Sequence, residues 1–283
     1  MRSSRQFRRT PAVLLGLVVA AFALPAPVSA DTVEAAGGTG PYDAEYTTTW
    51  RLRDHTVYRP VDLPDNERLP IVAWGNGACR ADGTWFENIL TEFASHGYLV
   101  IANGSPGGSG QTDAEMLTDA VDWAVRENTR LFSPYRGRLD TDSIAVMGQS
   151  CGGLETYEVA DDPRIDTTVI WNSGMFSDAD PNRLDHLHAP IAYFTGGPSD
   201  IAYENALNDW DDLPSGLPAF MGHLDVGHYG TFGEPDGGEY GRVGTAWLDW
   251  QLKGDTQARA EFVGGDCGLC TDPDWDTDQK NLS

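Results

Sequence analysis

Short apolar runs alternate along this chain with longer stretches in which apolar residues recur at helical spacing. The longer stretches at 84–97 and 112–129 are typical of amphipathic helices, and similar spacing recurs near 200–210 and 239–252. The short runs lack the alternating polar residues of a half-exposed strand, which indicates strands buried on both faces. These runs are LPIVAWG (69–75), YLVIANG (98–104), SIAVMG (143–148), DTTVIW (166–171), PIAYFTG (190–196) and LPAFMGH (217–223).

Strands that alternate with helices predict an α/β fold, in which a mostly parallel sheet carries helices on both faces. Two earlier segments, YTTTWRL (46–52) and TVYRPVDL (56–63), are rich in β-branched and aromatic residues and predict two further strands. The tail CTDPDWDTDQK (270–280) alternates acidic residues without the glycine of a calcium-binding loop, so we expect surface chain there. In a parallel sheet a ligand binds beyond the carboxyl ends of the strands, so the residues after each run are of most interest.

Residues 1–30 have the pattern of an export signal. Four arginines precede an apolar run at 12–24, and the small residues Val28-Ser29-Ala30 follow that run. The run is too short to span a bilayer, and no later segment is long and apolar enough. We predict a Sec-type signal that is cleaved after Ala30. The Arg8-Arg9 pair raises twin-arginine export as an alternative, but the residues after the pair do not support it.

The length of the chain indicates its number of domains, and its net charge indicates which partners it can bind. Residues 31–42 are predicted to be a flexible leader, and residues 43–283 form a single domain that is long enough to bury a substantial core. The formal net charge is −24, and removal of the four signal arginines takes it to about −28. Such acidity argues against nucleic acid and anionic membranes as partners. We therefore expect a secreted monomer.

Four cysteines are an even number, which predicts disulfides in an exported chain. Three pairings are possible. The C-x-x-C formed by Cys267 and Cys270 resembles half of a metal site, but no second C-x-x-C or histidine pair accompanies it, so we favour a local disulfide there. Cys79 then pairs with Cys151, and buried free thiols are the alternative.

The segment AVMGQSCGGLE (145–155) places a serine between glycines, after a predicted strand and before a predicted helix. A serine hydroxyl is a poor nucleophile unless it is exposed and supplied with a base. A sharp strand-to-helix turn exposes the hydroxyl, and flanking glycines make room for that turn. The motif Gly148-Gln149-Ser150-Cys151-Gly152 therefore predicts Ser150 as a nucleophile, although G-x-S-x-G also occurs in purely structural turns.

The base and its orienting acid should follow later strands. His228, in the glycine-rich segment VGHYGTF, is the preferred base, and His223, at the end of a predicted strand, is its rival. Asp200, directly after another predicted strand, is the preferred acid. Its rivals are Asp178, Asp180, Asp185 and Asp225. The chain order Ser150, Asp200, His228 is that of α/β-hydrolases.

With these motifs the chain resembles the α/β-hydrolase superfamily over roughly residues 45–255. Within it, the chain is similar to the secreted, lidless group of polyester hydrolases, bacterial cutinases and dienelactone-hydrolase-like esterases. The similar stretches are ASHGYLVIANG before the serine, and GGPSD and VGHYGTF after it. The chain departs from the polyester hydrolases in having Gln149 and Cys151 beside the serine, and Asn76-Gly77 where an aromatic residue is usual.

The resemblance also implies where an oxyanion would be bound. One donor is the backbone N–H of Cys151, and the second comes from the loop after the strand at 69–75, for which we name Asn76. A Cys79–Cys151 disulfide would join these two halves of the oxyanion hole. Candidates for the substrate pocket are Trp171, Met175 and Phe176, with Trp85 and Tyr229 on its other side; core packing is the competing interpretation of each.

The sequence thus predicts a secreted serine hydrolase that cleaves carboxylic esters through an acyl-enzyme, without a metal or other cofactor. Candidate substrates include bulky and polymeric esters, although polymer cleavage is not assumed. The stretch between Trp171 and Pro190 is too short for a large lid, so we expect an open cleft. A peptidase or acyltransferase that uses the same three residues is one alternative. A non-catalytic secreted binding module is another, but a decayed site usually loses one of the three side chains.

Overall fold

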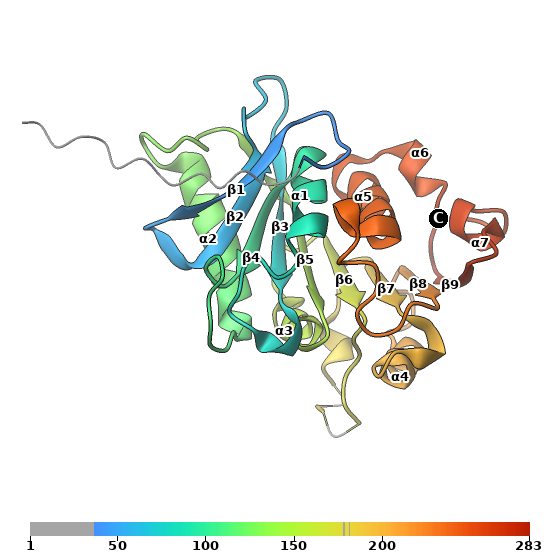
Figure 1. The fold of residues 1–283 in the computed structure, drawn as a ribbon. Helices are drawn as coiled ribbons and strands as arrows, with labels where there is room; N and C mark the ends of the chain where they lie inside the picture. The colour runs from blue at the N-terminus through green and yellow to red at the C-terminus, as the bar shows by residue number, and fades with distance from the viewer. Residues whose placement is uncertain (1–36, 178, 181) are drawn as a thin grey trace, which may run out of the picture.

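A nine-stranded sheet forms the centre of the computed structural model, which describes residues 37–177, 179–180 and 182–283 (Figure 1). The predicted signal at 1–30 and the first part of the predicted leader lie outside the described residues. The strand order is β1-β2-β4-β3-β5-β6-β7-β8-β9. The strands are β1 (Ala44–Thr49), β2 (Leu52–Pro60), β3 (Leu69–Gly75), β4 (Leu99–Asn103), β5 (Leu139–Gln149), β6 (Thr167–Trp171), β7 (Ile191–Thr195), β8 (Ala219–Leu224) and β9 (Trp275–Lys280).

Parallel pairing runs from β4 through β3 and β5 to β8. These six strands correspond to the six buried runs of the sequence, so the prediction of a mostly parallel α/β sheet is confirmed. Antiparallel strands complete both edges, with β1 and β2 beside β4 and with β9 beside β8. The carboxyl ends of β3, β5, β6, β7 and β8 therefore lie along one edge of the sheet.

The tail at 270–280 is mostly exposed or half-buried, as expected, but its second half is a regular strand. This half forms β9, in which Trp275 pairs with Leu224 and Lys280 pairs with Ala219 of β8. Trp275 is buried, whereas Asp276 and Asp278 are exposed. The alternating acidic residues are thus the solvent-facing side chains of an edge strand, where charge discourages pairing with other chains.

Helices cover both faces of the sheet (Figure 1). Neighbouring residues of one strand pack on opposite faces: in β3, Trp74 packs into the core on one face of the sheet, whereas Ala73 packs into the core on the other. This two-sided burial is why the central runs are continuously apolar. Among the described residues, none of the helices has the length and apolar character needed to cross a membrane. The helices are α1 (Glu87–Ser95), α2 (Ala114–Thr129), α3 (Cys151–Val159), α4 (Tyr203–Asp212), α5 (Gly238–Lys253), α6 (Thr256–Arg259) and α7 (Gly268–Thr271).

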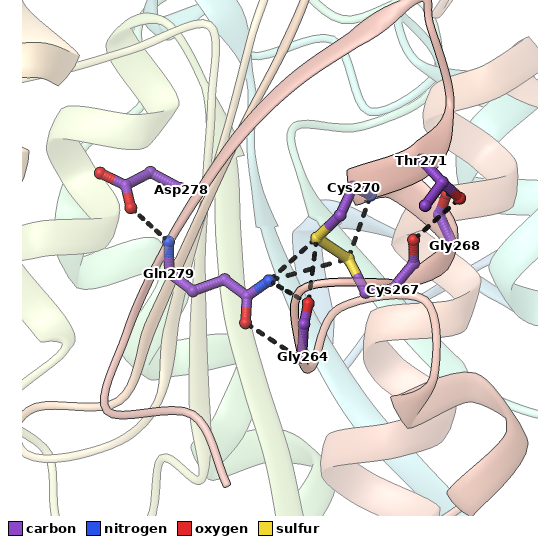
Figure 2. The surroundings of a disulfide bond; sticks show 7 residues. All are labelled: Gly264, Cys267, Gly268, Cys270, Thr271, Asp278 and Gln279. Atoms are coloured by element: carbon purple, nitrogen blue, oxygen red, sulfur yellow. Dashed lines mark hydrogen bonds between the residues drawn. A yellow bond between two sulfur atoms is a disulfide. The ribbon is translucent and has the colours of Figure 1, made fainter.

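A disulfide fastens the segment between α5 and β9. Cys267 and Cys270 are bonded to each other at the start of α7, as the sequence predicts (Figure 2). Gln279 of β9 lies beside the disulfide, and its side chain donates to Gly264 O at 3.1 Å and accepts from Gly264 N at 3.2 Å. The disulfide loop is therefore held against the edge strand β9. It is separate from the segments that follow the parallel strands.

Candidate active site

Ser150 lies at the turn between β5 and α3, with φ 53° and ψ −117°. Residues other than glycine rarely adopt a positive φ, so the surrounding chain must hold this conformation. A β-carbon on Gly148 would collide with the Gly152 carbonyl, and a β-carbon on Gly152 would collide with the Gly75 carbonyl. Both glycines of the motif are therefore needed for β3, the turn and α3 to approach this closely.

Two other strand ends deliver side chains to Ser150. His228, after β8, places Nε2 at 3.0 Å from Ser150 Oγ, and its Nδ1 lies 2.6 Å from Oδ1 of Asp200, which follows β7. The contacts form one continuous chain from hydroxyl to imidazole to carboxylate. Such a chain can move a proton from the hydroxyl to the imidazole while the carboxylate holds the opposite ring nitrogen.

Asp200 is buried, and each of its carboxylate oxygens accepts hydrogen bonds. Oδ1 accepts from Ala202 N at 2.9 Å, and Oδ2 accepts from Gly196 N at 3.0 Å and from Asn172 Nδ2 at 2.9 Å. Burial alone would raise the pKa of Asp200, but the hydrogen bonds from His228 and from these donors outweigh it and lower that pKa. Asp200 is therefore an ionised carboxylate with a fixed orientation.

The rival residues make other contacts. His223 Nδ1 lies 2.6 Å from Thr195 Oγ1. Asp225 accepts from Ser199 Oγ at 3.2 Å, and Asp180 accepts from Asn182 N at 3.0 Å. Asp185 is exposed in a short helical turn (Leu184–His186), and Asp178 lies outside the described residues. Of the described histidines and acids considered for the site, His228 and Asp200 are the pair that the structure connects to Ser150.

The loop after β3 is joined covalently to the start of α3. This loop contains a short 3₁₀ helix, η1 (Gly77–Cys79), and Cys79 is bonded to Cys151. Ala78 and Cys79 have φ of 53° and 47°, so the loop makes a tight turn toward α3. The predicted pairing of Cys79 with Cys151 is confirmed.

Asn76, named from the sequence as the second oxyanion donor, is not among the residues that line the cleft over Ser150. Its buried side chain accepts from Trp74 Nε1 at 3.1 Å and donates to the carbonyls of Arg80, Asp82 and Asn103 at 2.9, 3.0 and 2.6 Å. Gly77 and Ala78 line the cleft instead. Asn76 thus fastens the loop by its side chain, and the next two residues of the loop border the cleft that contains Ser150.

Gln149 connects the nucleophile turn to the histidine loop. Its Nε2 donates to the His228 carbonyl oxygen at 3.0 Å, and the residue is only 4% exposed. A β-carbon on Gly77 would collide with the carboxamide oxygen of Gln149, so the side chain of Gln149 packs directly against the loop at Gly77. The Gln149 side chain therefore fixes the spacing between Ser150, His228 and the loop after β3.

An open cleft of about 390 Å³ lies over Ser150. Ile201 and Tyr229 are 82% and 79% exposed, so their apolar surfaces form part of its rim. Trp85 forms part of the cleft wall, and the Arg80 guanidinium lies 4.4 Å from the centre of its ring and supports it there. The apolar lining consists of Trp85, Phe86, Ile201, Tyr229 and Phe232.

The three residues predicted for the substrate pocket lie elsewhere. Trp171 is buried in the core, where it stacks on Phe194 at 4.6 Å between ring centres. Met175 and Phe176 line a separate hollow beside Asp209. The physical reason is that Asn172 has φ 42° and turns the chain after β6, and Met175 N then donates to Asp209 Oδ2 at 2.8 Å. The segment is thereby drawn toward α4.

Sequence reasoning missed Asn172, which orients Asp200, and it missed the bridging contact of Gln149. Asn172 directly follows β6, so the rule that functional residues follow parallel strands could have found it. Phe86 and Phe232 carry no such signal, because buried aromatic residues more often belong to the core.

Comparison with known proteins agrees with this geometry. The PETase family, described as PET hydrolase-like, matches residues 21–265. No curated protein matched the chain. The matched residues include Ser150, Asp200 and His228, whereas Cys267, Cys270 and β9 lie beyond them. The chain therefore belongs to the PETase family of α/β-hydrolases, whose members are carboxylic ester hydrolases.

Proposed function

We propose that the protein is a serine esterase in which Ser150 attacks the ester carbonyl, His228 takes its proton and Asp200 orients the imidazole. The observation that carries this proposal is the 3.0 Å contact of His228 Nε2 with Ser150 Oγ, with Asp200 on the opposite ring nitrogen. The protonated imidazole then gives its proton to the departing alcohol. Water activated by the same histidine hydrolyses the acyl-enzyme and regenerates the serine.

The tetrahedral intermediates carry a negative charge on the former carbonyl oxygen, which needs hydrogen-bond donors. Cys151 is the first residue of α3, so its N–H has no acceptor within the helix. We assign this N–H as one donor and a backbone N–H of the Gly77–Ala78 segment as the other. The Cys79–Cys151 disulfide supports this assignment because it ties the two chain segments together beside the serine.

The cleft favours a neutral, apolar ester. Its described lining includes neither lysine, arginine, aspartate nor glutamate, although the whole chain is strongly acidic. Aromatic and aliphatic walls gain free energy by covering an apolar acyl or alcohol group. The exposed Ile201 and Tyr229 leave the rim open, which supports bulky and polymeric esters as substrates.

We further propose that the protein is secreted and that the segment 1–30 is its export signal. The two disulfides support an oxidising compartment, since disulfides are uncommon in reducing ones.

The test combines a substrate series with labelling of the serine. We expect turnover of p-nitrophenyl butyrate, stoichiometric labelling of Ser150 by an alkyl phosphonate, and loss of at least about 10³-fold in kcat for Ser150→Ala. A peptidase would prefer p-nitroanilides of amino acids to the esters. A binding module would leave both substrates and the phosphonate untouched, and either result would overturn the proposal.

A further inference from the structure

A buried carboxyl group lies one helical turn behind the proposed oxyanion hole. Glu155 follows Cys151 by one turn of α3, so the two side chains share a face of the helix. Glu155 is 6% exposed, and the partners of its two oxygens are uncharged. The reaction as proposed does not use this group, and a lone buried carboxyl is costly to keep in a fold.

Glu155 connects α3 to the loop after β3 by two routes. Its Oε1 accepts from Thr112 Oγ1 at 2.5 Å, and the N–H of Thr112 donates to the Cys79 carbonyl at 2.7 Å. Its Oε2 accepts from Asn103 Nδ2 at 3.2 Å, and the carbonyl of Asn103 accepts from Asn76 Nδ2 at 2.6 Å. With the Cys79–Cys151 disulfide, these bonds close a ring between α3 and the loop that lines the cleft.

We infer that Glu155 is a positioning residue for the oxyanion hole, and that it holds the loop after β3 against α3 as a protonated carboxylic acid. This inference rests on the proposed function, because it assigns Glu155 a role in the same reaction. The disulfide fixes one side of the ring covalently, whereas the Glu155 side is held by hydrogen bonds alone.

The surroundings favour the protonated form. Burial is the main cause that raises the pKa of Glu155 to about 7, with smaller contributions from the nearby carboxylates of Asp113 and Glu158, while the hydrogen bonds from Thr112 and Asn103 oppose the rise. The Asn103 Oδ1 atom is buried without a partner. A protonated Glu155 can donate to that oxygen once the amide of Asn103 turns over.

The ionised form would oppose catalysis. A carboxylate still accepts from Thr112 and Asn103, so the ties to the loop remain. A buried negative charge behind the oxyanion hole, however, repels the charge that develops on the substrate oxygen, and low polarity strengthens that repulsion. This repulsion acts mainly on the transition state, so it lowers kcat more than it changes KM.

The experiment measures kcat and KM for p-nitrophenyl butyrate from pH 6 to pH 9 in the wild type and in Glu155→Gln. Glutamine keeps the shape of the protonated acid and cannot ionise. We expect the ratio of the kcat of Glu155→Gln to that of the wild type to rise severalfold between pH 6 and pH 9, with KM unchanged. Asp161→Asn is the control, since it removes one exposed charge just beyond the end of α3, away from the hydrogen bonds of Glu155, and its kcat should follow the wild type at every pH.

A second pair of variants tests the ring from the loop side. Thr112→Val removes the hydroxyl at nearly constant volume and should lower kcat by about 10-fold at pH 6, whereas Thr112→Ser should retain most of it. A ratio for Glu155→Gln that stays flat with pH, or a wild-type kcat in Thr112→Val, overturns the inference. If Ser150 is still labelled stoichiometrically in that case, the proposed triad survives, whereas an active Ser150→Ala removes the proposed function itself.

Discussion

His223 lies near the end of β8 and His228 follows that strand, and the two have different partners. His228 contacts Ser150 and Asp200, whereas His223 contacts Thr195, and its ring meets that of Tyr203 edge-on at 4.8 Å between centres. Burial lowers the pKa of His223 despite the nearby carboxylates of β9. His223 is therefore a neutral, structurally bonded side chain, away from the proton-transfer chain.

This difference gives the first prediction. His228→Ala should lose at least about 10³-fold in kcat, because Ser150 then has no base. His223→Ala should lose less than about 10-fold in kcat, since it breaks one hydrogen bond to Thr195. Steady-state hydrolysis of p-nitrophenyl butyrate measures both variants, and circular dichroism checks that both are folded. The reverse order of the two losses would show that the base has been misassigned.

The second prediction concerns Asp200, whose carboxylate receives hydrogen bonds from four groups. Asp200→Asn should lower kcat by about 10⁴-fold, since an amide can no longer hold the imidazole in the required tautomer. Asp225→Asn is the matched control, because Asp225 bonds only to the exposed Ser199 side chain, and it should retain the wild-type kcat within about twofold. Equal losses in the two variants would contradict the assignment of the acid.

At the scale of single elements, the strand-end rule predicted the three proposed catalytic residues but not the walls of the cleft. Ser150, Asp200 and His228 each follow a strand, and strands are visible as apolar runs. The direction of a loop after its strand depends on contacts that no local pattern records. The bond from Met175 N to Asp209 on α4, which turns that segment away from the cleft, is an example.

The strand β9 was missed for a related reason. Its apolar content is limited to Trp275, so its pairing with β8 depends on backbone hydrogen bonds and on one buried ring. An edge strand with a solvated face resembles a charged loop in sequence. Gln149 illustrates the same limit at the site, because its bond to the His228 carbonyl requires two distant segments to meet.

The third prediction concerns the two disulfides. Cys79–Cys151 spans 72 positions along the chain and should stabilise the fold by about 4 kcal/mol on the chain-entropy account, whereas Cys267–Cys270 spans only three. Cys79→Ser with Cys151→Ser should therefore lower both kcat and the free energy of unfolding. Cys267→Ser with Cys270→Ser should leave kcat within about twofold of the wild type, because that loop contacts β9 rather than the cleft. Activity and urea denaturation of both double variants provide the measurement, and equal effects on kcat would contradict the role of the first disulfide.

At the scale of the whole molecule, the excess of acidic over basic residues affects how the free energy of unfolding depends on pH. The chain has 43 acidic and 19 basic residues, so most carboxylates have no cation to pair with. Two of the acids are buried with raised pKa values. Burial raises the pKa of Glu155 to about 7 and that of Asp209 to about 6, and the latter accepts from Tyr157 Oη at 2.6 Å. Other acids, among them Asp200 and Glu127, have lowered pKa values because hydrogen bonds to them outweigh their burial.

These two groups of acids predict how stability depends on pH. Between about pH 4 and pH 7 the folded protein keeps protons on Glu155 and Asp209 that the unfolded chain has released, so the free energy of unfolding falls as the pH rises through this window. Below about pH 4 the sign reverses, because acids with lowered pKa values such as Asp200 must be protonated. Maximum stability should therefore lie near pH 4.

We expect the free energy of unfolding to fall from pH 5 to pH 8 by roughly 2 kcal/mol for each of the two raised acids. Urea denaturation at fixed high salt measures it, since salt screens the general repulsion between surface carboxylates. Glu155→Gln and Asp209→Asn should each remove their own share of the slope, whereas Asp161→Asn, which changes an exposed acid, should leave the slope unchanged. A wild type whose stability is constant from pH 5 to pH 8, or a slope that is undiminished in the double variant of Glu155 and Asp209, would show that the two buried acids do not hold protons in the folded protein.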